Sequence, residues 1–172
     1  MSTFEIRDAT PADLPAMLAI YNDAVIDSTA SWDYEPWSPM RHADWYAHKI
    51  ESGQPVLVAV EDGVLLGYAT YSEFRPKVGY MTTREHSVYV RASARGRGVG
   101  RALVEALIEQ ARQAGVHVLV GGIASDNIAS LTLHARLGFV EVGRLPEVGR
   151  KFDRWLDLVL VQLTLSAPEA KA

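Results

Sequence analysis

The chain contains no cysteine, which excludes a disulfide framework and any zinc site built on thiolates. Its five histidines are scattered along the sequence, so we expect no metal site. No apolar run approaches the ~20 residues that span a bilayer, and the N-terminus lacks a basic segment followed by an apolar one. We therefore expect a cytoplasmic protein that has no membrane partner.

Neither sign of charge dominates, because 17 Lys and Arg residues face 21 Asp and Glu residues and give a net charge of −4. The two signs are interspersed, which argues against a nucleic-acid partner, and the local basic patch at residues 95–101 suits a small anionic ligand better. A chain of 172 residues is long enough for one domain with a substantial core. We expect that domain over residues 1–165 and a flexible tail over residues 166–172.

The stretch that organises the chain, residues 85–115, predicts a strand, a glycine loop and a helix. Polar or aromatic and aliphatic side chains alternate over residues 85–91, which predicts a strand whose two faces differ in chemistry. Apolar side chains recur at helical spacing over residues 99–114, and Gly115 then ends the helix.

The loop between them carries three glycines, and backbone without Cβ atoms can turn tightly and bring its N–H groups close to a ligand. The next helix begins with unpaired N–H donors and the positive end of its dipole. The loop does not end in the Gly-Lys-Ser/Thr of a P-loop, and its Gly-x-Gly-x-Gly spacing differs from a dinucleotide fingerprint. It predicts a pyrophosphate site made by Arg95, Gly96, Arg97, Gly98, Val99, Gly100 and Arg101.

The remaining patterns predict a mixed sheet covered by helices, an α+β fold. An Asp-Gly turn at residues 62–63 indicates a hairpin, and the loop at residues 28–39 carries three aromatics that either pack on the core or form a pocket wall or dimer contact. The other predicted strands are at 3–8, 117–123, 139–144 and 155–165, the last two joined by 147–154. The other predicted helices start at Thr10 and Pro11, run from Ser38 to Gly53 with Trp45, Tyr46 and Ile50 buried, and run over 128–137.

Two motifs resemble the GCN5-related N-acetyltransferase (GNAT) family. Residues 95–100 match Arg/Gln-x-x-Gly-x-Gly/Ala, and residues 127–139 match Asn-x-x-Ala/Ser-x-x-Leu-Tyr-x-x-x-Gly-Phe except at His134. The resemblance implies a mostly antiparallel mixed sheet of about six to seven strands with about four helices, and acetyl-CoA as cosubstrate. It also implies that the splayed strand pairs with the pantetheine arm and that the loop holds the diphosphate, with CoA contacts from Val88, Tyr89, Val90, Asn127 and Ser130.

A subgroup resemblance narrows this further. His134, with Glu85-x-Ser87-Val88-Tyr89-Val90 and Gly149-x-Lys151-Phe152-x-x-Trp155-x-Asp157, is similar to the phosphinothricin and methionine sulfoximine N-acetyltransferases. These enzymes acetylate the α-amino group of a small amino acid analogue, and the resemblance implies detoxification chemistry and a homodimer. It places substrate contacts at Arg75, Lys77, Tyr80, Glu85, Ser87 and Tyr89.

Two residues are catalytic candidates. An α-ammonium group, with a pKa of about 7.7 to 8 in peptides, must lose a proton before its nitrogen attacks a thioester, so a base is required. Glu85 could take that proton directly or through a water. His134 stands where the family places a thiolate-protonating tyrosine, and it could act as base, acid or hydrogen-bond donor.

Other functions remain open at this stage. The acceptor could instead be a protein N-terminus or another amine, or the domain could be a sensor that binds acyl-CoA without transferring the acyl group.

Overall fold

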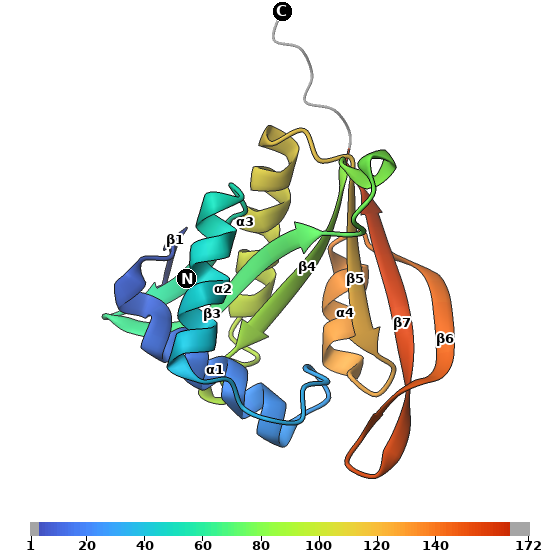
Figure 1. The fold of residues 1–172 in the computed structure, drawn as a ribbon, viewed down its shortest axis with the longest axis horizontal. Coiled ribbons are helices and arrows are strands. Elements are labelled where there is room, and N and C mark those ends of the chain that lie inside the picture. The colour runs from blue at the N-terminus through green and yellow to red at the C-terminus, as the bar shows by residue number, and fades with distance from the viewer. Residues whose placement is uncertain (1–3, 166–172) are drawn as a thin grey trace, which may run out of the picture.

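The computed structural model describes residues 4–165, which form a seven-stranded sheet with helices on both faces (Figure 1). The strand order is β1-β2-β3-β4-β5-β7-β6, and of these neighbours only β4 and β5 run parallel. The strands are β1 (Glu5–Asp8), β2 (Val56–Glu61), β3 (Val64–Glu73), β4 (Thr83–Val90), β5 (Val118–Ala124), β6 (Val140–Lys151) and β7 (Arg154–Thr164). The α-helices are α1 (Leu14–Asp27), α2 (Pro39–Glu51), α3 (Val99–Gln113) and α4 (Ile128–Arg136). The predicted fold class is confirmed, and the predicted tail at 166–172 lies outside the described residues.

The sheet separates two hydrophobic cores. Alternate residues of β2 point to opposite faces, so Leu57 and Ala59 pack with α3 while Val56 and Val58 pack with α1. Helices α1 and α2 cover one face, and α3 and α4 cover the other (Figure 1). The amphipathic pattern predicted for α3 holds, since its apolar stripe, including Leu103 and Leu107, is fully buried.

The sheet opens between β4 and β5. Strand β4 pairs with β3 over seven residue pairs, from Gly67 and Val90 to Glu73 and Arg84, but its parallel pairing with β5 covers only Thr83 to Glu85. Past Glu85 the two strands diverge (Figure 1). The backbone groups on that edge of β4 therefore lie in the middle of the sheet without a neighbouring strand to satisfy them.

Strand β6 corrects the prediction that residues 147–154 form a connection. The strand continues to Lys151, and only Phe152 and Asp153, both with positive φ, turn the chain into β7. Register shifts between Glu141 and Gly143 and between Leu145 and Gly149 are bulges, and they allow the strand to pass a proline and still pair with β7. Proline and glycine in this segment mark bulges and not a loop.

Helix α2 corrects the predicted burial of Ile50, whose side chain is 54% exposed. His42 and Lys49 are buried instead. The Lys49 ammonium donates to the carbonyl of Tyr71 at 2.7 Å and to the Gln54 side chain at 3.0 Å, so a polar residue takes the inward position.

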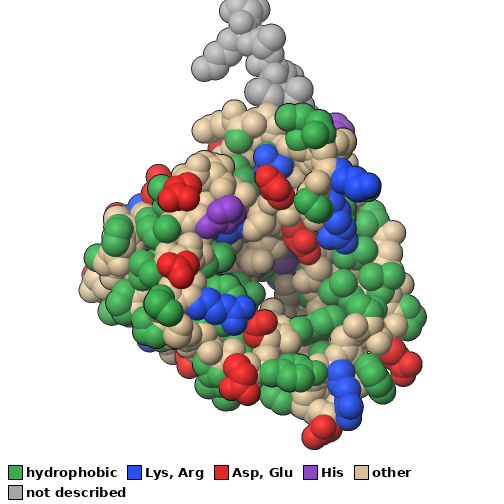
Figure 2. All heavy atoms as spheres, viewed as in Figure 1, with side chains coloured by type: hydrophobic (Ala, Val, Ile, Leu, Met, Phe, Trp, Pro, Cys, Tyr) green, Lys and Arg blue, Asp and Glu red, His purple; other side chains and the backbone are tan. Residues whose placement is uncertain are grey.

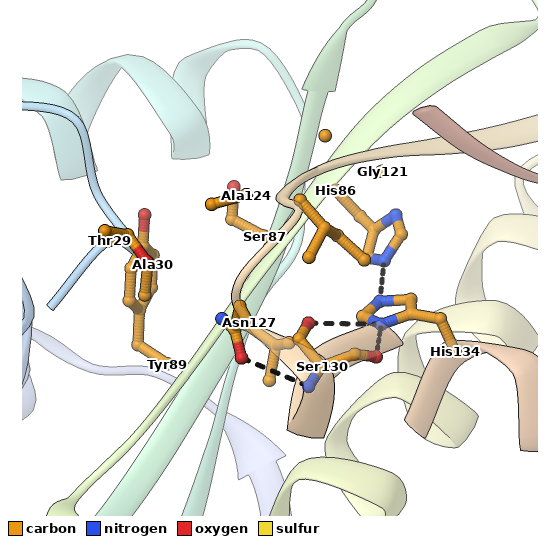
Figure 3. Close-up of a pocket in the computed structure, with 13 residues that line it drawn as sticks. Thr29, Ala30, His86, Ser87, Tyr89, Gly121, Ala124, Asn127, Ser130 and His134 are labelled. Carbon is orange, nitrogen blue, oxygen red and sulfur yellow. Dashed lines mark hydrogen bonds between the residues drawn. The ribbon is translucent and has the colours of Figure 1, made fainter. Parts of the chain in front are cut away.

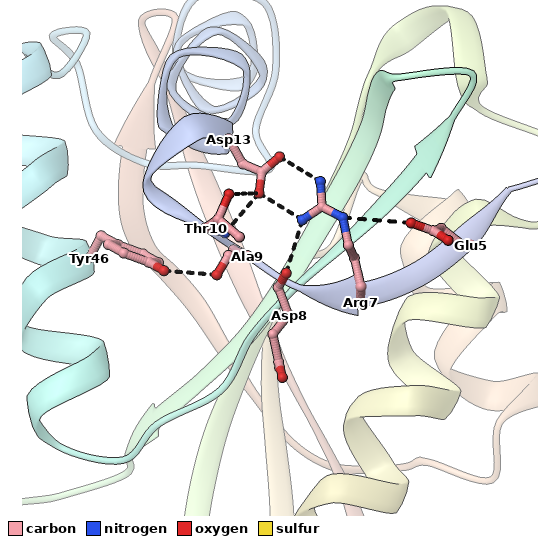
Figure 4. A network of polar contacts seen from close by, with 7 residues as sticks. All are labelled: Glu5, Arg7, Asp8, Ala9, Thr10, Asp13 and Tyr46. Atoms are coloured by element: carbon pink, nitrogen blue, oxygen red, sulfur yellow. Dashed lines mark hydrogen bonds and ion pairs between the residues drawn. The ribbon is translucent and has the colours of Figure 1, made fainter.

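The entry into α1 is fixed by an ion pair (Figure 4). The Arg7 guanidinium donates to both Asp13 oxygens at 2.8 and 2.9 Å, and the backbone N–H and hydroxyl of Thr10 donate to the same carboxylate. The first turn is therefore 3₁₀, and the α-helix begins at Leu14 and not directly after the predicted cap. These donors, Arg7 first among them, lower the pKa of Asp13 to about 2.

We expect Asp13→Asn to destabilise the protein by about 1 to 2 kcal/mol at pH 7, a figure reduced for the solvent screening of the partly exposed Arg7. A carboxylate whose pKa is lowered on folding stabilises the native state above its unfolded pKa and loses this effect as the pH falls through its folded pKa. The difference between Asp13→Asn and wild type should therefore shrink between about pH 4 and pH 2.

Urea unfolding at pH 7 and at pH 2 to 3 measures the difference. Asp8→Asn is the control, because Asp8 contributes only a backbone carbonyl to this network. A loss of stability in Asp13→Asn that stays constant down to pH 2 would contradict the assignment.

Candidate functional site

A cleft of about 450 Å³ lies where β4 and β5 diverge (Figure 3). Figure 2 shows the molecule hollowed near the centre of this face. The cleft is lined by β4, β5, α4 and the loop after α1, and its lining residues are Thr29, Ala30, His86, Ser87, Val88, Tyr89, Gly121, Gly122, Ile123, Ala124, Asn127, Ser130 and His134. Of the predicted cosubstrate contacts, this brings together Val88, Tyr89, Asn127 and Ser130.

Two adjacent glycines of β5 make room for side chains of β4. A Cβ atom on Gly121 would lie 2.9 Å from Cε1 of His86, and one on Gly122 would lie 3.5 Å from Oε1 of Glu85. The first contact is too short for any side chain, so Gly121 is required by His86. Glu85 thus lies over the edge of the cleft although it does not line it.

The predicted pyrophosphate loop has the backbone that such a site requires. Gly96 and Gly98 have φ of +75° and +86°, a left-handed conformation that side chains disfavour, and Gly98 is the N-cap of α3. The N–H donors at the start of α3 and the positive end of its dipole therefore face an exposed turn. This arrangement fits a diphosphate.

The sequence predicts that all three arginines of this loop meet the ligand, but two of them already pair with carboxylates of the protein. Arg97 donates to both oxygens of Glu61 at 2.7 Å, and Arg101 pairs with Glu105 at 2.8 Å. Arg95 is exposed and makes no side-chain hydrogen bond or ion pair within residues 4–165. Arg97 therefore fixes the loop against β2, and Arg95 is the exposed arginine of the loop that makes no such contact among the described residues.

Helix α4 and its N-cap bring three of the predicted residues to the cleft, and the third, His134, is almost fully buried in its wall. The Asn127 side chain accepts from the backbone N–H of Ser130 at 3.2 Å and caps the helix. His134 is 2% exposed, with Nδ1 2.7 Å from the Ser130 carbonyl oxygen and Nε2 2.8 Å from Nε2 of His86. Both ring nitrogens of His134 thus have protein partners, and burial lowers its pKa.

His86 is the functional candidate that sequence analysis missed. Strand alternation places it on the face of Val88, away from Glu85 and Ser87, and this signal was present in the sequence. Its meeting with His134, 48 positions later in the chain, was not.

The loop after α1 contributes Thr29 and Ala30 to one wall of the cleft, while its aromatic Trp37 lines a second pocket. Lys151, buried in β6, donates to the carbonyls of Ser28 at 2.7 Å and Ser31 at 2.6 Å. The ring of Trp32 lies so close to Gly149 that a Cβ there would approach it to 2.2 Å. These contacts hold the loop against the β6–β7 hairpin.

A second pocket of about 520 Å³ adjoins the cleft on the α1 and α2 side of β4. Aromatic rings dominate it, with the Tyr21 ring 4.8 Å from that of Trp37 and 5.3 Å from that of Tyr89. Its lining comprises Tyr21, Trp37, His42, Trp45, Lys49, Tyr68, Thr70, Ser72, Ser87 and Tyr89. Ser87 and Tyr89 line both spaces and so connect them.

Three predicted substrate contacts lie apart from these pockets. Arg75, Lys77 and Tyr80 are exposed in the connection between β3 and β4 and line neither space. In Figure 1 this connection lies at the end of β4 opposite the divergence. The structure therefore brings Ser87 and Tyr89 to the cleft, and Glu85 to its edge, but not Arg75, Lys77 and Tyr80.

Within residues 4–165, no helix is long and apolar enough to cross a membrane. The same part of the chain contains no group of three or more His, Cys, Asp or Glu side chains that could hold a metal ion.

Comparisons with known proteins agree with this geometry. A model of the acetyltransferase (GNAT) family matches residues 17–139. The L-methionine sulfoximine/L-methionine sulfone acetyltransferase of Pseudomonas paraeruginosa is 52% identical, covering 93% of this chain and 94% of its own. An acetyltransferase structure from Salmonella typhimurium with acetyl-CoA superimposes with a TM-score of 0.93 at 43% identity over 98% of both chains. A Brucella melitensis structure described as ribosomal-protein-alanine N-acetyltransferase has a TM-score of 0.92 at 49% identity, over 94% of this chain and 99% of that one.

We expect Gly98→Ala to weaken CoA binding beyond its effect on stability. Alanine at a φ of +86° is strained by about 1 kcal/mol or more, and relaxing that strain turns the N–H groups of the loop away from the diphosphate. Gly53→Ala is the matched control, because Gly53 also has a positive φ, +63°, with open space around it, but lies after α2 and away from the loop. Calorimetric titration with CoA should show roughly tenfold weaker binding for Gly98→Ala alone. Equal CoA affinity of the two variants would remove the loop from the binding site.

Proposed function

Because this chain belongs to the GNAT acetyltransferase family and its acyl donor is acetyl-CoA, we propose that it acetylates the α-amino group of a small free amino acid analogue. The acceptor is of the methionine sulfoximine, methionine sulfone or phosphinothricin type. The identity to the Pseudomonas relative supports this acceptor, since it extends over nearly all of both chains.

The fixed wall of the cleft is the observation that carries the proposal. A protein N-terminus would need an open groove, whereas Lys151 here ties the loop at residues 28–31 to the β6–β7 hairpin through two short hydrogen bonds. Behind the shared residues Ser87 and Tyr89, the aromatic pocket offers space for one short side chain. The methylene and methyl groups of a methionine-like side chain suit such walls.

In this proposal, main-chain groups hold acetyl-CoA. The unpaired edge of β4 at Val88, Tyr89 and Val90 forms hydrogen bonds with the pantetheine arm, which takes the place that β5 would have if the two strands stayed paired. The diphosphate loop comprises Arg95, Gly96, Arg97, Gly98, Val99, Gly100 and Arg101. Arg97 fixes its shape by pairing with Glu61 of β2, while Arg101 pairs with Glu105 within α3. Asn127 and Ser130 contact the cosubstrate from α4, and the N–H groups near Val90 face the charge that develops on the thioester oxygen.

Glu85 is the proposed base. It lies on the same face of β4 as Ser87 and Tyr89, at the end of the three paired residues, and its carboxylate reaches over Gly122 into the mouth of the cleft. An ammonium group entering between Ser87 and Tyr89 would find this carboxylate within reach, directly or through one water.

Arg75, Lys77 and Tyr80 remain proposed substrate contacts, although they lie beyond the far end of β4. Both cations are exposed, and the guanidinium of Arg75 is the better partner for a substrate carboxylate.

The protein is proposed to be a homodimer, which its exposed apolar side chains on β6 and β7 support: Val140 is 60%, Val142 54% and Trp155 61% exposed. We further propose a single domain over residues 1–165, a cytoplasmic location and a role in detoxification.

Acetylation of a protein N-terminus is the second candidate, because the Brucella structure of similar identity is described as a ribosomal-protein-alanine N-acetyltransferase. Thiol release from acetyl-CoA separates the two when it is measured with methionine sulfone, methionine sulfoximine, phosphinothricin and a peptide beginning with alanine. Turnover with the free analogues supports the proposal. Turnover with the peptide alone would overturn it.

We expect Glu85→Gln to lower kcat roughly a hundredfold or more while CoA binding stays unchanged, because only proton removal is lost. Glu51→Gln, at the exposed end of α2, is the control for the loss of one carboxylate. Steady-state kinetics on the preferred acceptor, with calorimetry for CoA, make the measurement. Wild-type turnover in Glu85→Gln would show that this carboxylate is not the base.

A further inference from the structure

Two histidines meet inside the cleft wall (Figure 3). His86 from β4 and His134 from α4 are 5% and 2% exposed, and their Nε2 atoms are 2.8 Å apart. The ring of Phe139 packs against both, 5.1 Å from each, and Gly121 leaves the space that His86 fills. This contact is therefore built by packing from several elements.

The far nitrogens of both rings face carbonyl oxygens. Nδ1 of His86 is 2.8 Å from the Val120 oxygen, and Nδ1 of His134 is 2.7 Å from the Ser130 oxygen. A carbonyl oxygen only accepts, so each Nδ1 forms a hydrogen bond only when it carries a hydrogen. The contact between the two Nε2 atoms also needs a hydrogen. Three hydrogens on four nitrogens satisfy every contact, and they give the pair one positive charge.

Each neutral arrangement, with two hydrogens, leaves at least one lone pair against another acceptor. The least costly has the hydrogens on Nδ1 of His86 and Nε2 of His134, because the Ser130 hydroxyl, 3.4 Å from Nδ1 of His134, can then donate to the bare nitrogen. Adding one proton at that nitrogen completes the remaining bond to the Ser130 carbonyl without moving either ring.

Burial opposes the charged form, and it lowers the pKa of both histidines, with the neighbouring charge of His134 lowering that of His86 further. The hydrogen bonds to Val120 and Ser130 act in the opposite sense. Among the described residues on β4, β5, α4 and the segment at Phe139, no carboxylate or cation besides the pair contributes to either pKa. The resting pair is therefore neutral and is preorganised to take up one proton.

We propose that His86 and His134 act as one proton acceptor during acyl transfer: the proton enters at Nδ1 of His134, and the resulting charge is shared through the hydrogen between their Nε2 atoms. The inference rests on the proposed function. His134 exchanges protons with the cleft through the Ser130 hydroxyl, and His86 is a positioning residue that stabilises the charged state of His134.

The proton balance is closed. The acceptor ammonium has three hydrogens on nitrogen and the amide product keeps one. Glu85 removes the first and passes it to solvent. As the N–C bond forms, the second moves to Ser130 Oγ while the serine hydrogen moves to Nδ1 of His134. As the C–S bond breaks, the pair returns one proton by the same route to the CoA sulfur, which leaves as the thiol.

The first test needs no substrate. Nitrogen-15 NMR of the histidine rings across a pH titration should show His86 and His134 taking up a single proton in one common step, with a far-downfield shared hydrogen. His86→Gln should abolish both features, whereas His48→Gln and His117→Gln, at exposed positions, should leave them intact. Two independent titrations, one per ring, would overturn the proposal. This outcome is independent of the acceptor, so it separates failure of the pair from failure of the proposed function.

The second test uses the pH profile of kcat. Activity requires the neutral pair, so it falls on the acid side at the pKa of the pair. Without the shared proton, the charged form of His134 is less stable, and His86→Gln should move that limb about one pH unit lower, a tenfold change in proton affinity. We expect kcat to fall roughly tenfold to a hundredfold while the KM for acetyl-CoA stays within about twofold.

Gly121→Ala is a second variant in case His86→Gln folds poorly. It displaces His86 without removing it, so it should shift the acid limb of the kcat profile in the same direction. A reduced kcat with an unchanged acid limb in both variants would show that His86 is merely structural.

Discussion

The structure depends on the point at which β4 and β5 stop pairing, after only three residue pairs. Strands inside a sheet normally satisfy one another, so the divergence leaves main-chain donors and acceptors facing an internal cleft. An extended, amide-rich ligand can complete that ladder as a strand would, and in the proposed function the pantetheine arm of acetyl-CoA does so. The glycines of β5 belong to the same constraint, since they admit His86 and Glu85 where the strands separate.

Residues around the cleft divide into those that face it and those that hold its walls. Lys151 and Gly149 belong to a sequence motif that resembles one enzyme subgroup, yet in the structure they anchor the loop after α1. Arg97 has a similar role in the glycine loop, which it ties to Glu61 of β2. The residues of a functional motif can thus act by fixing the shape of a pocket, without contacting the ligand themselves.

Sequence reasoning reached what local patterns encode. Alternation located β4, helical spacing located α3, and glycine spacing located a loop that does adopt left-handed backbone. Sequence reasoning failed where contacts with residues far away in the chain determine the structure. Lys49 is buried because its ammonium group donates to the Tyr71 carbonyl of β3, while the neighbouring Ile50 is exposed. The extension of β6 to Lys151 depends on bulges against β7, and the meeting of His86 with His134 depends on the packing of α4 on the sheet. None of these is visible in a window of neighbouring residues.

The titrating groups of the cleft fall into two compartments. Burial raises the pKa of Tyr89 to about 12, so its phenol stays protonated and can only donate or accept hydrogen bonds near neutral pH. Glu85 lies at the edge of the cleft, whereas His86 and His134 are buried in its wall, with Nδ1 of His134 3.4 Å from the Ser130 hydroxyl. In the proposed mechanism, the proton taken by Glu85 is lost to solvent, while the proton taken by the buried pair is retained until the C–S bond breaks and the leaving sulfur needs it.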